Sequence, residues 1–166
     1  ECPDPTRIWS GDSLEVFVIA GEGKKQKRIQ WLISPGADER TPATRLVQHD
    51  NANNLDVVPQ AEGVKVERKK VEGGYALEAL LPWSAVGLDA REGAQARIQV
   101  YCNDRDDLNF YTGSPYRATW FPGGETHSRP DQAFAVRLAK QTEAKTAMRL
   151  VPYCDSDFYE LRVSAV

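Results

Sequence analysis

The stretch Leu14-Glu15-Val16-Phe17-Val18 decides the fold class, because it has an aliphatic residue at every second position: Leu14, Val16 and Val18. Successive side chains of a β-strand point to opposite faces of a sheet, whereas a helix repeats its apolar face every three to four residues. Leu14, Val16 and Val18 are therefore predicted to share a buried face, and Glu15 to point away from it. The same period of two recurs along the chain, which predicts a β-rich protein.

Further strands are predicted where this period returns between turn residues. The second strand has Ile29, Trp31 and Ile33 on one face, with Gln30 and Leu32 opposite. Shorter alternations predict strands at 64–66, 75–81, 98–102, 118–120, 134–138, 148–151 and 158–163. Gly73-Gly74 suits a hairpin turn, and the residues 83–86 that follow Pro82 predict one short helical turn.

Strands at this spacing, separated by turn residues, predict an all-β fold: an antiparallel β-sandwich of the two-sheet jelly-roll or immunoglobulin-like kind. The polar segments 34–62 and 103–115 are predicted to be long loops, which often carry function. We expect residues 1–140 to form the main part of the sandwich, and residues 141–166 to form a C-terminal hairpin that completes it.

Composition narrows the classes of function. The chain has 166 residues, of which 41% are hydrophobic and 27% charged, and a formal net charge of -3. One globular domain fits this length, and the charge argues against a nucleic-acid partner. No apolar run reaches the roughly 20 residues of a membrane helix. His49 and His127 have no zinc-site spacing, and no nucleophile elbow is present, so we expect neither a catalytic zinc nor a hydrolase triad. Paired carboxylates for glycoside hydrolysis stay open.

Trp9 and Glu15 form the sharpest candidate for a binding site. Trp9 precedes the first strand, and Glu15 lies on the face of that strand opposite to its apolar residues. An exposed indole offers a flat surface for the C–H face of a sugar, and a nearby carboxylate accepts hydrogen bonds from hydroxyl groups. The alternative is a Trp folded over the strand edge beside a solvated Glu.

An acidic run after the 98–102 strand is a candidate for a structural calcium site. Asn103, Asp104, Asp106 and Asp107 supply oxygen ligands of the kind that calcium prefers. Turn-forming hydrogen bonds explain the same residues, and Arg105 within the run would oppose a cation. Both interpretations remain open at this point.

Several motifs in a fixed order resemble one family. They are Trp-Ser-Gly-Asp-Ser-Leu-Glu-Val-Phe at 9–17, Gly-Gly-Tyr-Ala-Leu-Glu-Ala-Leu-Leu-Pro-Trp at 73–83, Asn-Asp-Arg-Asp at 103–106 and the later Trp120. This set is similar to the family-nine carbohydrate-binding modules and their DOMON-like relatives. Those proteins are β-sandwiches attached to secreted polysaccharide-degrading enzymes, and the resemblance runs from residue 8 to about residue 138.

The resemblance implies a non-catalytic module that holds a mono-, oligo- or polysaccharide. It implies that Trp9 stacks on sugar, that Glu15 binds hydroxyl groups and that Gln30 lies near them. The family grips a ring between two aromatics, and Phe121 or His127 would substitute for the absent second Trp. It also implies that the chain belongs to a larger, secreted or periplasmic protein.

The C-terminal segments look like a hairpin that the family places before the Trp9 motif. They are residues 146–151 and 155–163, with residues 141–145 as the connector. This order suggests a circular permutation or a piece cut across two tandem modules. Permutation predicts that the tail pairs beside the strand of residues 14–18.

Two other functions stay open. The chain could be a structural or docking sandwich without sugar binding. DOMON-like relatives also hold haem between a Met and a His, which Met148 and His127 would supply. Met148 filling the core is the simpler interpretation of that residue.

Overall fold

The computed structural model describes residues 5–36, 42–50, 55–58, 62–72, 74–105, 116–139, 147–150 and 161–164. Within these ranges the chain consists of antiparallel β-strands joined by turns, with 3-10 helical turns as its only helices. None of the helices in the described ranges is long and apolar enough to cross a membrane.

The elements follow one another in a simple order. The strands are β1 (Ser13–Ala20), β2 (Lys27–Ser34), β3 (Ala43–His49), β4 (Leu55–Val58), β5 (Lys65–Val71), β6 (Gly74–Leu80), β7 (Gln95–Asp104), β8 (Tyr116–Thr119), β9 (Phe134–Arg137), β10 (Ala147–Leu150) and β11 (Leu161–Ser164). The 3-10 turns are η1 (Pro5–Ser10), η2 (Gly23–Lys25) and η3 (Trp83–Val86). The predicted helical turn is η3, while η1 and η2 were not predicted.

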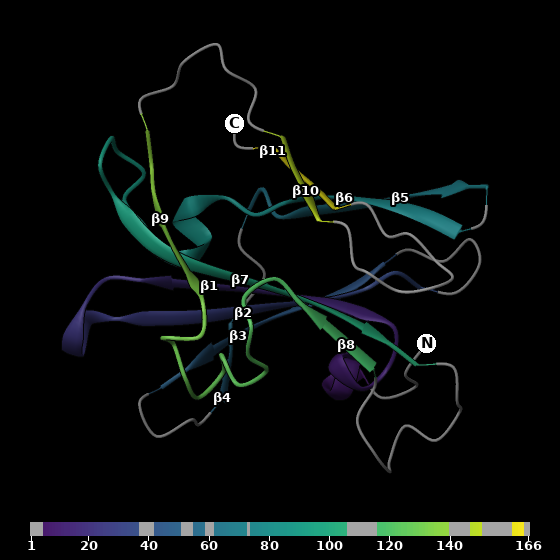
Figure 1. Cartoon of the computed structure of the whole chain (residues 1–166), viewed down its shortest axis with the longest axis horizontal. Coiled ribbons are helices and arrows are strands. Elements are labelled where there is room, and N and C mark those ends of the chain that lie inside the picture. Colours follow the sequence, from purple (N-terminus) through teal and green to yellow (C-terminus); the bar gives the residue numbers. More distant parts are fainter. Residues whose placement is uncertain are drawn as a thin grey trace.

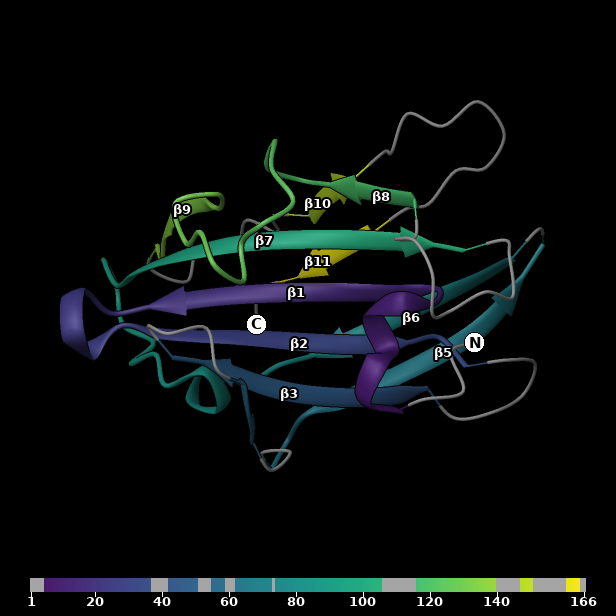
Figure 2. The same cartoon turned by 90° about the horizontal axis from the view of Figure 1, so that it is seen from below.

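The strands form two layers. Seven of them build one sheet in the order β4-β3-β2-β1-β7-β8, with β9 pairing the other end of β7. The hairpins β5-β6 and β10-β11 lie on one side of this sheet (Figures 1 and 2). This arrangement confirms the predicted all-β antiparallel sandwich.

The apolar core lies between the large sheet and the β5-β6 hairpin. Its buried members are Val18, Ile29, Trp31, Ile33, Leu46, Val64 and Val86. Leu14 and Val16 pack against this cluster from β1, and Trp83 packs against it from η3. The faces predicted for the first two strands are therefore correct, and we call this side of the large sheet the inner face.

The opposite side of the large sheet, here called the outer face, is also covered. Ile8 and Trp9 of η1 pack there on Leu32 and Val47. Residues 120–133, which connect β8 to β9, are here called the cover segment, and they cross the outer face beside β7. This covering buries several polar side chains of the sheet.

The predicted loop at 34–62 is wrong over the eleven residues of β3 and β4, which lie within it. β3 packs on both faces: Leu46 joins the inner core, whereas Val47 packs with Ile8 and Leu32 on the outer face. Two adjacent buried residues remove the alternation that marks a half-buried strand. The polar neighbours of this pair then make the stretch look like a loop.

The predicted pairing of the tail is also wrong. β1 pairs with β2 on one edge and with β7 on the other, so neither edge takes a C-terminal strand. β10 and β11 pair with each other instead. They do form the expected hairpin, in the layer that also contains β5 and β6 (Figure 1). The proposed connector at 141–145 lies outside the described residues, and a permuted order gains no support from the pairing.

Candidate functional site

Glu15 stands at the centre of a buried polar network on the outer face. Its side chain points away from the apolar core, as predicted, but the residue is only 2% exposed. Asn103 Nδ2 donates to its Oε1 at 2.7 Å, and Gln30 Nε2 donates to its Oε2. Arg117 Nη2 donates to Oε1 at 3.3 Å and forms an ion pair with the carboxylate. The alternative of a solvated Glu15 is therefore wrong.

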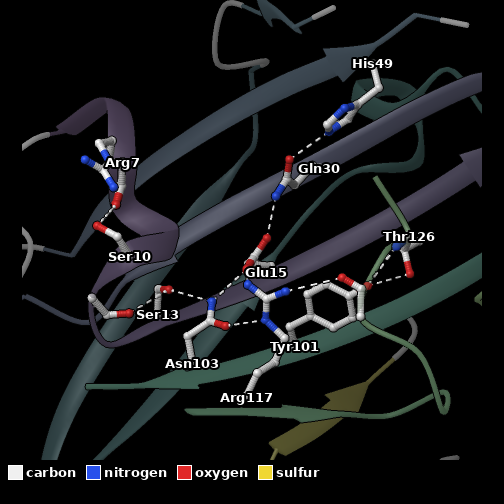
Figure 3. Close-up of polar contacts among 12 residues, drawn as sticks. Arg7, Ser10, Ser13, Glu15, Gln30, His49, Tyr101, Asn103, Arg117 and Thr126 are labelled. Atoms are coloured by element: carbon white, nitrogen blue, oxygen red, sulfur yellow. Dashed lines mark hydrogen bonds and ion pairs between the residues drawn. The ribbon is translucent and has the colours of Figure 1, made fainter. Parts of the chain in front are cut away.

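The strand registers bring these residues together from distant parts of the chain. Ser13 of β1 is opposite Asn103 of β7, which is opposite Arg117 of β8. Arg117 Nε donates to Asn103 Oδ1 at 2.7 Å, and Asn103 Nδ2 also donates to Ser13 Oγ at 3.0 Å. Figure 3 shows the carboxylate of Glu15 between the side chains of Gln30, Asn103 and Arg117. The network thus ties four strands at one end of the outer face.

Burial of Glu15 makes its ionised form less favourable than it is in water. Removal from water disfavours the carboxylate and raises the pKa of Glu15 above its ordinary value. The hydrogen bond from Asn103, the charge of Arg117 and the hydrogen bond from Gln30 act in the opposite direction. The carboxylate is therefore held by donors in a site where its ionised form is costly.

His49 extends the network on the side of β3. Its Nε2 donates to Gln30 Oε1 at 2.7 Å, since the Gln30 amide nitrogen already donates to Glu15. Burial, with the nearby charges of His127 and Arg28, lowers the pKa of His49 to about 4. His49 is thus neutral at neutral pH, and its ring lies 6.3 Å from that of His127.

We expect the low pKa of His49 to make the fold less stable in mild acid. The unfolded chain binds a proton at His49 near pH 6.5 and the folded chain only near pH 4, so stability is lost as the pH falls through this window. The loss between pH 8 and pH 5 is about 2 kcal/mol. Urea unfolding of the parent chain and of His49→Gln at both pH values measures it.

His127→Gln is the matched control, because His127 is the other histidine and is exposed. It should keep most of the pH dependence of the parent chain, because burial is the largest cause of the low pKa of His49 and the charge of His127 a smaller one. Glu15 is present in all three proteins, so most of its contribution cancels in the comparison. Equal pH dependence in His49→Gln and the parent chain would refute the assignment.

The cover segment is held mainly through its backbone. Gln99 Nε2 donates to Phe121 O at 2.9 Å, and Gln99 Oε1 accepts from Phe121 N at 2.7 Å. The Tyr101 hydroxyl donates to Thr126 Oγ1 at 2.7 Å and accepts from the Thr126 N–H at 2.9 Å. Arg28 donates to the backbone oxygen of His127. Side chains of the sheet therefore set the position of this segment over the outer face.

Trp9 lies beside the Glu15 network. It packs on Leu32 and Val47, and Leu32 is the cross-strand neighbour of Glu15. The indole is half-buried, and the guanidinium of Arg7 lies 5.3 Å from its ring centroid. Trp9 and Glu15 therefore lie close together on the outer face. The ring is less exposed than expected, because it also closes a small apolar cluster.

The two candidates for a second aromatic lie in different places. His127 stands over the outer face, with its backbone bonded to Arg28 and its ring near His49. The ring of Phe121 packs edge-on to Phe134, with centroids 5.1 Å apart, in a cluster that includes Trp120. The structure therefore brings His127 toward the Glu15 network and Phe121 to another cluster.

Two of the four expected calcium ligands, Asn103 and Asp104, lie within the described residues. The side-chain oxygen of Asn103 accepts from Arg117, so this residue belongs to the Glu15 network. Asp106 and Asp107 lie outside the described residues, while Asp104 ends β7. In the part of the chain that the structure describes, no three His, Cys, Asp or Glu side chains gather in a metal-binding group.

The residues of the haem alternative lie on different sides of the large sheet. His127 belongs to the cover segment on the outer face, whereas β10, which contains Met148, lies in the layer with β5 and β6 (Figures 1 and 2). Axial ligands must reach the same iron from its two faces. This placement does not favour a haem held by these two residues.

Four members of the site were not predicted: His49, Gln99, Arg117 and Thr126. A signal for one of them was present, because Gln99, Tyr101 and Asn103 alternate with the apolar residues of β7. Polar residues at every second position of a strand marked a second, covered face. Arg117 and Thr126 carried no such local signal.

Comparison with known proteins gives one match. The model of a family described as "Carbohydrate family 9 binding domain-like" matches residues 3–116, more than half of the chain. No curated protein and no solved structure matches the sequence significantly. The matched range contains Trp9, Glu15, Gln30 and Asn103, and it ends directly before Arg117.

Proposed function

The chain belongs to the carbohydrate family 9 binding domain-like family, and from this premise we propose that the outer face binds a sugar at the centre formed by Trp9 and the Glu15 network. Modules of this kind are typically non-catalytic, and the proposal includes no bond chemistry. It places the chain in a secreted or periplasmic protein that acts on polysaccharides.

One observation carries the proposal: the hydrogen-bonded Glu15–Gln30–Asn103–Arg117 network lies next to the indole of Trp9 on the outer face, opposite the main apolar core. Polar groups of a sheet are costly to bury, and an apolar outer face would stabilise the fold equally well. Retaining them in a fixed geometry suits recognition of hydroxyl groups, which both donate and accept hydrogen bonds. Arg117 and His127 are the exposed members at this centre.

The roles follow from position. Trp9 supplies the apolar surface on which the C–H face of a sugar ring stacks. Arg117, beside Glu15, and His127, beside His49, present polar groups to the sugar. Glu15 is almost fully buried. It acts mainly by orienting Gln30, Asn103 and Arg117 rather than as the direct hydroxyl acceptor that the family resemblance implies.

We expect Trp9→Ala to weaken sugar binding at least about tenfold, because the stacking surface is lost. Isothermal titration with a panel of mono- and oligosaccharides, with and without calcium, measures the affinity. Trp9→Phe keeps a flat ring and should retain part of the affinity. Circular dichroism and urea unfolding of each variant separate lost binding from lost structure.

Tyr116→Ala is the matched control. Tyr116 is 80% exposed and precedes Arg117 on β8, so its side chain points to the other face of the sheet. Its loss should leave the affinity unchanged. If Trp9→Ala binds like the parent chain, the site lies elsewhere. If no sugar binds to the parent chain, a structural or docking module explains the fold better.

A further inference from the structure

Arginines gather on the outer face, although the chain as a whole has a net charge of -3. In β1, β2, β3, β7, β8 and β9, the registers place five arginines but only one acidic residue on this face. These residues are Arg28, Arg45, Arg97, Arg117 and Arg137, with Glu15 as the acid. Glu15 is buried and paired with Arg117, and Arg28 is buried as well. The accessible charge of these strands on the outer face is therefore positive, and it comes from Arg45, Arg97, Arg117 and Arg137.

Two arginines, one from η1 and one from β3, lie near Trp9. The guanidinium of Arg7 lies over the indole at 5.3 Å from the ring centroid. Arg45 Nη1 donates to the backbone oxygen of Thr6 at 2.8 Å, which places a second cation against η1. Asp12, an acid of this region, accepts a hydrogen bond from the backbone N–H of Arg105 at 2.9 Å. A ring stacked at Trp9 therefore has cations close to it.

Arg117 lies on the other side of Glu15 from Trp9, and its guanidinium is already oriented to pair with an anion. Its guanidinium donates to Asn103 at 2.7 Å, to the backbone oxygen of Gly124 at 3.3 Å and to Glu15 at 3.3 Å. These bonds engage three of the five N–H groups of a guanidinium, and the side chain is 26% exposed. A fixed guanidinium loses little conformational freedom when it pairs with a carboxylate.

The position of Arg7 discriminates between neutral and acidic ligands. A sugar that stacks on the indole must share or displace the guanidinium that lies over it. A neutral sugar offers only hydroxyl groups in exchange for this cation–π contact. A carboxylate offers a charge-assisted and bidentate pair, which is a stronger interaction.

We propose that the ligand of this site is an acidic saccharide, a glycan containing uronic acid. Its ring stacks on Trp9, and its carboxylate pairs with the nearby arginines, which are Arg7, Arg45 and Arg117. This inference rests on the proposed function and specifies its class of ligand. It predicts that affinity depends on the charge of the sugar as well as on its shape.

Matched ligands test the charge directly. Oligogalacturonate and its methyl ester have the same sugar and linkage, and a xylo-oligosaccharide with a glucuronate branch is compared with the unbranched one. In titrations of the whole chain at low ionic strength, we expect each acid to bind about tenfold more tightly than its neutral counterpart. The preference should shrink as salt is added, because exposed charges are screened.

Variants locate the effect. Arg7→Gln should reduce the preference for the acid at least about threefold, because it removes the cation over the indole. Arg137→Gln is the control: Arg137 lies opposite Gln95, near the start of β7, whereas the partner of Glu15 in that strand is Tyr101. This variant should keep the preference of the parent chain.

Each remaining outcome has a distinct meaning. Equal affinity for acidic and neutral sugars overturns the inference and leaves the proposed function intact. If none of the saccharides binds, both are overturned. If the acid still binds as tightly in Trp9→Ala, the arginines act as a general ion exchanger, which overturns an acidic-sugar site at Trp9.

Discussion

Glu15→Ala is expected to lower the free energy of unfolding by about 4 kcal/mol. The substitution removes the common acceptor of three donors, from Gln30, Asn103 and Arg117. Gln30 and Asn103 are themselves buried, so their amide groups would be left without this partner inside the protein. Urea unfolding at neutral pH measures the loss.

Glu22→Ala is the comparison for Glu15→Ala. Glu22 is exposed at the start of η2 and makes no side-chain capping bond. Its replacement should change stability by less than about 0.5 kcal/mol. A loss below about 1 kcal/mol for Glu15→Ala would mean that water replaces the carboxylate readily. The network would then be less important to the fold than its burial suggests.

Gln99→Leu has the second largest expected effect, about 3 kcal/mol of stability. Gln99 is 0% exposed, and its side-chain amide donates a hydrogen bond to the backbone oxygen of Phe121 and accepts one from the backbone N–H of the same residue. It also donates to the backbone oxygens of Gly123 and Gln132 at 3.3 and 3.5 Å. Leucine has nearly the same size but offers none of these bonds, so the cover segment would lose its main attachment to β7.

Two measurements test the role of Gln99. Urea unfolding gives the stability, and hydrogen exchange at the Phe121 amide reports whether the cover segment has loosened. Gln95→Leu is the matched control, because Gln95 is exposed on the same strand and the same face. Parent-like stability and unchanged protection in Gln99→Leu would show that other contacts hold the segment.

Much of the sandwich could be predicted from the sequence because its strands bury one face at a time. β1 and β2 show clear alternation, and their apolar faces were assigned correctly. β3 could not be recognised, since Leu46 and Val47 are both buried. The pairing of the tail was also wrong, because local periodicity says nothing about which strand lies beside which.

The candidate site was predicted in part for a similar reason. Trp9, Glu15 and Gln30 lie in or next to strands with strong patterns, so their relative position follows from the pairing of β1 with β2. Asn103 was assigned to a metal because its acidic neighbours follow it in sequence. Arg117 is 102 residues from Glu15, and only the pairing of β7 with β8 brings the two together.

The way in which the cover segment is attached has a consequence for how specificity could change. Arg28, Arg97 and Arg117 bond to its backbone oxygens, and these belong to His127, Ala133 and Gly124. Backbone oxygens are present whatever the side chains are. Exposed positions such as Glu125 and Arg129 could therefore be randomised in a library while the segment keeps its path. The sheet would act as a constant framework, and the cover segment as its interchangeable recognition loop.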